Sequence, residues 1–402
     1  MRIGAYFGET SPEVGGGFTF QDEVLRALVK QAVNAPQHEF FVLGTKSSLE
    51  DYISSLRPPS NLSFLCVRAP SLVERVNEWL KRGFLILASV LKGRGPLEKL
   101  AREHKLDLVW FIAGGCFETL DTPYIATVWD LQHRLQPWFP EVSANGVWAA
   151  RETQYRYFLS QASFVIVGTE AGRDEVHLFY GIPKFRIWKL PHPTPFLSEK
   201  RSTAADADIR SKYKLPDDYI FYPAQFWPHK NHINLLHAVK TLQSTHGVAA
   251  SLVLVGSDKG NAAYVRQVAT ELGLREHVHF LGFVPQTDLH DLYKNASLMA
   301  YVSLCGPENL PPLEAFAVGC PVVVSEVSGS REQFGDAVLF CDPKNPDDIA
   351  RNIYRLYSEA DLRAQLIENG RVRAASWTAD DFVKGIFKIA DDFTAIKRNW
   401  PA

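Results

Sequence analysis

Short continuous apolar runs alternate with amphipathic stretches along most of the chain, and this alternation is the feature that most restricts the fold. The apolar runs that we interpret as buried strands are residues 2–7, 39–45, 62–67, 106–114, 124–130 and 164–169, and then 219–224, 250–257, 277–284, 298–304, 321–326 and 337–343. Amphipathic stretches with helical periodicity, such as 19–33 and 231–243, lie between them. Because apolar strands separated by helices are typical of parallel sheets with both faces covered, the pattern predicts an α/β protein.

The alternation stops at residues 191–212 and then starts again. This segment is rich in Pro, Ser and Ala and has mixed charge, which is typical of a linker. A chain of 402 residues is also too long for one compact core. We therefore predict two Rossmann-like, doubly wound domains, 1–195 and 196–378, and a C-terminal helix in 379–402 that crosses back to the first domain. We expect the two domains to face each other across a cleft, because open α/β sheets bind ligands at the carboxyl ends of their strands.

Charge and cysteine content exclude several classes of protein. The formal net charge is −2, so we expect no nucleic-acid partner. The five Cys residues are scattered and form no CxxC motif, which indicates reduced thiols in a cytoplasmic protein rather than a zinc site. The first residues become polar too soon for a secretory signal. The apolar segment 83–91 is far shorter than the ~20 residues that span a bilayer; it is interpreted as a core element or, alternatively, as a membrane-surface or lipid-acceptor contact.

A glycine run follows the first predicted strand. Gly16 and Gly17 come just before a helix, where glycines let backbone N–H groups approach a phosphate closely. The alternative is a flexible loop. The run is neither GxGxxG directly after a strand nor a Walker loop, which argues against a dinucleotide dehydrogenase or a P-loop kinase.

Three further groups of polar residues follow predicted strands. Lys230 precedes a helix, where its ammonium could reach a diphosphate; the alternative is a solvated lysine at a helix start. Asp130 and His133 follow a strand of the first domain, where they could act on a reacting oxygen or hold the fold. No third ligand accompanies the histidines near Lys230, so we expect no metal site.

The stretch 305–324, CGPENLPPLEAFAVGCPVVV, places acids at the start of a helix. Proline in the first turn costs nothing there, and the N–H groups of residues 308–310 are expected to point into the cleft. Glu314 could accept two hydroxyl protons of a ribose diol. For Glu308 and Glu314 the alternative is an acid that complements the helix dipole, an effect of only ~0.3–1 kcal/mol.

Together these motifs resemble the nucleotide-sugar site of retaining glycosyltransferases of family 4, which have the GT-B fold. The similar segments are YPAQFWPHKNHINLL, HFLGFVPQTDLHDLYKNASLMAYVSL and PENLPPLEAFAVGCPVVVSEVSGSREQFGDAVLFCDP in the second half, with DLQHRLQPWFPE and FVIVGTEAGRDEV in the first. The resemblance covers nearly the whole chain and is strongest from 219 to 343.

The resemblance implies roles for individual residues. Glu314 matches the second acid of the family's E-x7-E motif, which holds the ribose, and Lys230 matches the lysine that binds the donor diphosphate. Gly16 and Gly17 match a glycine loop near the diphosphate. Asn309 and Leu310 match positions whose backbone amides contact the donor sugar, and His133 lies in a segment that faces donor or acceptor.

Three departures from the family pattern affect these assignments. Gly306 stands where the first acid of E-x7-E belongs, with Glu308 the nearest acid. Gln225 stands where arginine is frequent, so Arg331, Arg173 or His229 would have to supply that charge. Trp129 replaces the His of the common HDL pattern.

The resemblance implies a cytoplasmic, metal-independent hexosyltransferase without a cofactor. It would move a hexose from a nucleoside diphosphate sugar, with UDP or GDP favoured, to a hydroxyl of a glycan, a lipid-linked or a small-molecule acceptor. Two alternatives are a GT-B sugar-nucleotide epimerase or hydrolase, and a non-catalytic subunit that binds a sugar nucleotide. Peripheral membrane contact is a further expectation.

Overall fold

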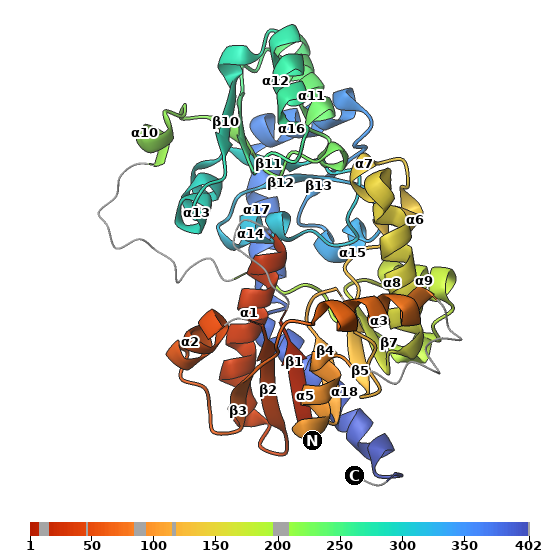
Figure 1. Ribbon diagram of the computed structural model, residues 1–402. Helices are drawn as coiled ribbons and strands as arrows, with labels where there is room; N and C mark the ends of the chain where they lie inside the picture. Colours follow the sequence, from red (N-terminus) through yellow and green to blue (C-terminus); the bar gives the residue numbers. More distant parts are fainter. Residues whose placement is uncertain (8–15, 46, 84–93, 115–117, 196–208, 401–402) are drawn as a thin grey trace. The chain divides into compact units, whose positions relative to one another are not determined.

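The computed structural model describes residues 1–7, 16–45, 47–83, 94–114, 118–195 and 209–400 (Figure 1). The chain forms two compact units. Unit 1 comprises Met1–Pro137, Val142–Pro193 and Ala379–Ala402, and unit 2 comprises Trp138–Glu141 and Thr194–Thr378. The predicted segment 83–91 lies outside the described residues, apart from Gly83.

Unit 1 contains a parallel sheet with the strand order β3-β2-β1-β4-β5-β6-β7 in its described part. The strands are β1 (Arg2–Tyr6), β2 (Glu39–Gly44), β3 (Leu62–Cys66), β4 (Leu108–Phe111), β5 (Tyr124–Thr127), β6 (Phe164–Val167) and β7 (Ile187–Lys189). The edge strand β7 was not predicted, because three residues are too few for a recognisable apolar run. The central strands are buried along their whole length, as expected for a sheet covered on both faces.

The C-terminal helix α18 belongs to unit 1. The helices of this unit are α1 (Gly16–Gln31), α2 (Ser47–Ser55), α3 (Leu72–Gly83), α5 (Pro96–Glu103), α6 (Gln132–Leu135), α8 (Val147–Gln161), α9 (Glu170–Tyr180) and α18 (Ala379–Lys397), while α7 (Pro140–Ser143) spans the return from unit 2. Helix α18 packs against α1 (Figure 1). The rings of Phe20 and Phe382 meet edge to face at 5.4 Å, and Lys30 Nζ lies 2.6 Å from Asp380 Oδ2.

Unit 2 contains a second parallel sheet with the order β10-β9-β8-β11-β12-β13 in its described part. Its strands are β8 (Tyr219–Pro223), β9 (Ser251–Val255), β10 (Val278–Gly282), β11 (Leu298–Tyr301), β12 (Val322–Ser325) and β13 (Leu339–Cys341). Its helices are α10 (Ile209–Tyr213), α11 (His232–His246), α12 (Ala262–Glu271), α13 (Gln286–Asn295), α14 (Leu310–Ala317), α15 (Ser330–Phe334), α16 (Pro346–Ser358) and α17 (Ala360–Ala375). The prediction of two doubly wound α/β domains is thus confirmed.

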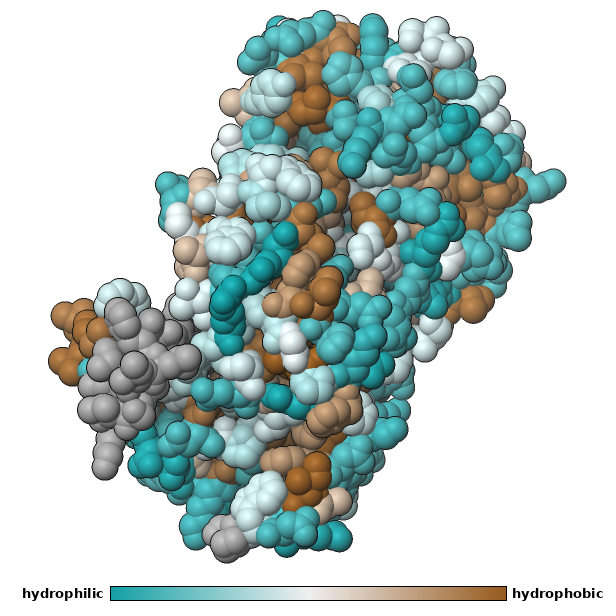
Figure 2. Space-filling model, turned by 90° about the vertical axis from the view of Figure 1, so that its right-hand side faces the viewer, coloured by the Kyte–Doolittle hydropathy of each residue, from teal (hydrophilic) through white to brown (hydrophobic). Residues whose placement is uncertain are grey.

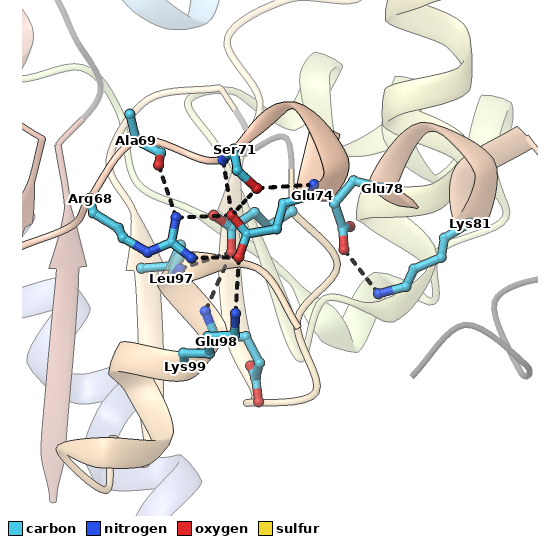
Figure 3. Close-up of polar contacts among 10 residues, drawn as sticks. Arg68, Ala69, Ser71, Glu74, Glu78, Lys81, Leu97, Glu98 and Lys99 are labelled. Carbon is cyan, nitrogen blue, oxygen red and sulfur yellow. Dashed lines mark hydrogen bonds and ion pairs between the residues drawn. The ribbon is translucent and has the colours of Figure 1, made fainter. Parts of the chain in front are cut away.

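Helix α3 turns its two acids toward ion-pair partners in the protein and four of its apolar side chains toward solvent. Glu74 pairs with Arg68 and Lys99, each at 2.5–2.9 Å, and Glu78 pairs with Lys81 at 2.9 Å (Figure 3). On the same helix the large apolar residues are exposed: Leu72 by 78%, Val73 by 69%, Val76 by 48% and Trp79 by 68%. This reverses the usual polarity of a surface helix. Elsewhere, the face drawn in Figure 2 carries hydrophobic patches within a mainly hydrophilic surface.

A buried carboxyl group lies next to this cluster of ion pairs. Glu118 Oε2 accepts hydrogen bonds from the backbone N–H of Leu97 at 2.8 Å and of Glu98 at 3.4 Å. Burial raises the pKa of Glu118 to about 7; the two N–H groups oppose the rise and the charge of Glu78 adds to it. Glu118 is therefore the acid of this cluster whose protonation changes near neutral pH.

The raised pKa of Glu118 predicts a pH-dependent stability. Between about pH 4.5 and about pH 7 the folded chain holds a proton on Glu118 that the unfolded chain has lost. The free energy of unfolding should therefore fall as pH rises through this window, by at most about 1.4 kcal/mol per pH unit. Glu118→Gln should remove this component, because its amide oxygen can still accept the N–H bonds. Urea denaturation at a series of pH values measures the slope.

Glu103→Gln changes an exposed acid at the end of α5 and serves as the control, which should keep the wild-type pH profile. An unchanged slope in Glu118→Gln would contradict the assignment.

Candidate functional site

Two loops of unit 2 begin side by side at one edge of its sheet. Strands β8 and β11 pair in parallel, with Ile220 opposite Leu298 and Phe221 opposite Met299. The loop after β8 leads through the short 3-10 turn Pro228–Lys230 into α11, and the loop after β11 leads into α14. Because the carboxyl ends of parallel strands meet at the same edge, residues far apart in the sequence come together there.

Backbone contacts hold the loop that carries Lys230. Asn231 adopts the left-handed conformation, with φ of 61°, and its side-chain Nδ2 donates to the carbonyl oxygens of Val302 at 2.9 Å and Pro343 at 2.7 Å. The backbone N–H of Leu304 donates to the carbonyl of His229 at 2.8 Å. These bonds attach the lysine loop directly to the loop after β11.

The Lys230 ammonium contacts a tyrosine at the end of β11. Its Nζ donates to Tyr301 Oη at 2.9 Å and lies 5.3 Å from the centre of the Tyr301 ring. The Tyr301 hydroxyl in turn donates to Asn309 Oδ1 at 3.0 Å. Lys230 and Asn309, both predicted site residues, are therefore connected through a residue that the sequence analysis did not assign.

The backbone at Gly306 explains why the expected acid is missing there. Gly306 has φ of 123°, and a Cβ at this position would lie 2.7 Å from the side-chain amide of Asn309. That amide is held by the bond from its Nδ2 to the Gly306 carbonyl at 3.1 Å. A glutamate at 306 would be strained in this backbone conformation and would displace the Asn309 side chain.

The backbone N–H of Asn309, which was expected to contact the donor sugar, is already bonded. It donates to Gln333 Oε1 at 2.8 Å, and Gln333 Nε2 donates back to the Asn309 carbonyl at 3.0 Å. Pro311 and Pro312 have no N–H, so Leu310 carries the one backbone donor among the first three residues of α14. The Asn309 amide thus has a partner within the protein, and its contact with the donor sugar, like that of Leu310, stays a prediction.

Glu314 is buried on α14. Its Oε2 accepts the hydroxyl of Tyr293, from α13, at 2.6 Å, and the carboxylate has no other hydrogen-bond partner among the described residues. Burial raises the pKa of Glu314, and the Tyr293 hydroxyl opposes that rise. Its other oxygen is thus left to accept a hydrogen bond from a ligand. Glu308 lies half-buried in the preceding loop, and its role stays a prediction.

Gln225, at the position where arginine is frequent in the family, stabilises its own loop. Its Nε2 donates to Ser257 Oγ at 2.9 Å and its Oε1 accepts from Trp227 Nε1 at 3.0 Å. Two of the three proposed substitutes for that arginine are engaged in unit 2: Arg331 pairs with Glu326 at 2.6 Å, and His229 with Glu141 at 2.5 Å. Arg173 lies in unit 1, where it donates to the Lys184 carbonyl at 3.0 Å.

The structure favours the structural alternative for His133 in unit 1. Its imidazole has no exposed surface, and its Nε2 lies 3.2 Å from Tyr180 Oη and 3.4 Å from Glu152 Oε2. Burial lowers the pKa of His133, and the nearby Arg151 lowers it further. The burial and these contacts favour a structural role, and the catalytic contact of His133 stays a prediction.

Asp130 forms a salt bridge rather than facing a ligand alone. Its Oδ1 accepts from Arg151 Nη2 at 2.8 Å and from the backbone N–H of Gln132 at 2.9 Å. Burial would raise the pKa of Asp130, but Arg151 and this N–H outweigh it and the pKa is lowered. Gly16 and Gly17 are the first residues of α1, and the segment that precedes them lies outside the described residues.

Residues 206–373 match the family model described as glycosyl transferases group 1. The matched residues lie within unit 2. The chain is 30% identical over 224 residues to O-antigen chain mannosyltransferase B of Escherichia coli, covering 55% of this chain and 58% of that protein. It is 26% identical over 257 residues to a D-inositol 3-phosphate glycosyltransferase of Streptomyces bingchenggensis, covering 59% and 56%. The chain thus spans little more than half the length of these curated relatives.

Solved structures share the fold over nearly the whole chain. A glycosyltransferase from Rickettsia africae superposes with a TM-score of 0.71 at 13% identity, covering 97% of this chain and 98% of that one. Anabaena HepE in complex with UDP-glucose superposes with a TM-score of 0.66 at 16% identity, covering 98% and 100%. The expected GT-B fold is thereby confirmed.

Gln333 should be important for the stability of unit 2, because its side chain satisfies both backbone groups of Asn309. Gln333→Leu leaves the buried N–H of Asn309 without a partner, which costs about 1–3 kcal/mol, whereas the Asn309 carbonyl still accepts the first hydrogen bond of α14. We expect a lower free energy of unfolding in urea, measured by tryptophan fluorescence. Gln267→Leu, the same change at an exposed position of α12, is the control and should alter stability little. Equal stabilities of the two variants would refute this role.

Proposed function

We propose that the chain is a hexosyltransferase that moves a sugar from a nucleoside diphosphate donor to an acceptor hydroxyl in the synthesis of a glycan, polysaccharide or glycolipid. The observation that carries the proposal is the placement of Lys230 beside the polar loop before α14, within the residues that match the group 1 glycosyl transferases. The mannosyltransferase relative and the UDP-glucose complex of HepE support the same class of reaction.

In the proposed reaction the bond between the anomeric carbon and the diphosphate oxygen breaks, and the acceptor oxygen bonds to that carbon. The acceptor proton leaves with the diphosphate, and the transfer retains the anomeric configuration. Negative charge grows on the leaving diphosphate, where the Lys230 ammonium and the Leu310 N–H at the start of α14 stabilise it without a metal ion. The second carboxylate oxygen of Glu314 accepts a ribose hydroxyl. The acceptor would bind to unit 1.

A charge-removing substitution at Lys230 tests this function. Lys230→Met should lower kcat/KM for transfer by about 10²–10³, the loss seen when one donor to a developing anion is removed. The donor is first chosen by a thermal-shift panel of UDP-, GDP- and ADP-sugars, in which ligand at 100 times Kd stabilises by roughly 2.7 kcal/mol. Lys240→Met removes an exposed lysine from α11 and should leave transfer unchanged. Wild-type activity in Lys230→Met would disprove the proposal.

Product analysis with and without acceptor separates transfer from the alternatives. Release of free sugar or an epimerised nucleotide without acceptor would indicate the epimerase or hydrolase class. Binding of the donor without turnover would indicate a non-catalytic subunit.

For membrane association we propose that the exposed face of α3 lies on an anionic lipid surface. Among the described residues no helix is long and apolar enough to cross a membrane. The side chains of Leu72, Val76 and Trp79 face outward beside the exposed Arg75, while Glu74 and Glu78 are turned inward and paired with cations (Figure 3). A helix that presents aromatic, aliphatic and cationic side chains, and keeps its acids away from the surface, suits the membrane interface.

Vesicles test this contact. The wild type should float with vesicles of phosphatidylcholine and phosphatidylglycerol, and Leu72→Ser/Val76→Ser/Trp79→Ser should stay in the soluble fraction. Leu178→Ser/Phe185→Ser removes equally exposed apolar side chains elsewhere in unit 1 and should bind like the wild type. If the wild type fails to bind and instead forms a dimer that the triple variant abolishes, the face binds a second copy of the chain and the membrane proposal is wrong.

A further inference from the structure

The Tyr301 hydroxyl is the link between the two loops that the proposed function depends on. It accepts a hydrogen bond from Lys230 Nζ at 2.9 Å and donates one to Asn309 Oδ1 at 3.0 Å. An ammonium can only donate, so the single hydroxyl hydrogen of Tyr301 must be directed elsewhere, and Asn309 Oδ1 takes it. Asn309 therefore keeps the hydroxyl oriented as an acceptor toward the lysine.

Two tyrosines from neighbouring strands hold the same lysine at opposite ends. The hydroxyl of Tyr222, at the end of β8, donates to the backbone carbonyl of Lys230, while Tyr301 contacts the ammonium. The two rings pack edge to face at 5.6 Å, which fixes their relative position. Lysine loses much of its side-chain entropy when it is ordered, so a lysine side chain that is already held binds an anion at a lower entropic cost.

The partner of the lysine is neutral, and this preserves its charge. Among the described residues no carboxylate forms an ion pair with Lys230, whereas Arg331 and His229 of the same unit are each paired with a glutamate. A carboxylate partner would compete with an incoming phosphate, but a phenol oxygen and the face of its ring orient the ammonium without neutralising it.

We propose that Tyr301 is a positioning residue that holds the Lys230 ammonium for the second phosphate of the donor, with Asn309 fixing its hydroxyl. The proposal rests on the proposed role of Lys230 in donor binding. It predicts that Tyr301 affects the binding of nucleoside diphosphates but not the binding of nucleoside monophosphates, which lack the second phosphate.

A double-mutant cycle tests the proposal through binding rather than turnover. The affinities of the wild type, Tyr301→Phe, Lys230→Met and the double variant are measured by calorimetry, with the nucleoside diphosphate and monophosphate of the preferred base. Tyr301→Phe should weaken diphosphate binding on the order of tenfold and leave monophosphate binding unchanged. In the Lys230→Met background the same change should have no further effect.

The chain offers a matched control for a lost buried hydroxyl. Tyr219 lies on β8 of the same sheet, is fully buried, and donates to the Leu292 carbonyl at 2.7 Å, so Tyr219→Phe should lower stability without selective loss of diphosphate affinity. The positioning role would be overturned if Tyr301→Phe lowered the affinity for both nucleotides equally. It would also be overturned if Tyr301→Phe still lowered the diphosphate affinity in the Lys230→Met background.

The outcomes for the two proposals are distinguishable. If Lys230→Met weakens binding of the diphosphate and Tyr301→Phe does not, only the role of Tyr301 is refuted. If Lys230→Met binds the diphosphate like the wild type, both the role of Lys230 and the proposal for Tyr301 are refuted.

Discussion

The parallel pairing of β8 with β11 is the constraint on which the candidate site depends. It sets the starting points of the two loops. Lys230 and Tyr301 are 71 positions apart in the sequence, yet this pairing brings them within hydrogen-bond distance. Side chains alternate between the faces of a strand, so a slip of one residue in this register would direct Tyr301 to the opposite face. The bonds of Asn231 to Val302 and Pro343 then fix the distance between the loops. The positions of the polar groups thus follow from a pairing of apolar strands.

The glycine at 306 and the asparagine at 309 are understandable only as a pair. The positive φ of Gly306 lets the loop turn, and the space that a side chain would occupy there holds the Asn309 amide. Gln333 then satisfies the backbone of Asn309 from the start of α15. A substitution at one of these three positions therefore changes which side chains fit at the other two. Gly306 is thus one part of a polar loop whose groups bond to one another through Asn309 and Gln333.

The fold could be predicted because apolar runs of strand length determine burial by themselves. The strand β7 was missed because it has only three residues, and its place is set by pairing with β6. Lys230 and Glu314 were proposed as site residues because polar residues after parallel strands meet at one sheet edge. The bond between Asn309 and Gln333 could not be predicted, since it joins residues 24 positions apart whose contact depends on the path of both loops. The burial of His133 among aromatic rings could not be predicted, because sequence does not tell which polar side chain after a strand turns inward.

The division of the chain has a consequence for how the protein can be dissected. The chain passes from one unit to the other after Pro137, Glu141, Pro193 and Thr378, so neither unit is a single continuous stretch of sequence. A fragment that stops at Pro193 lacks α18, and the ring of Phe20 loses its contact with Phe382. A fragment that starts at Thr194 lacks the Glu141 carboxylate that holds the residue next to Lys230. Each half thus carries part of what the other needs, and isolated halves are poor substitutes for the intact chain in binding studies.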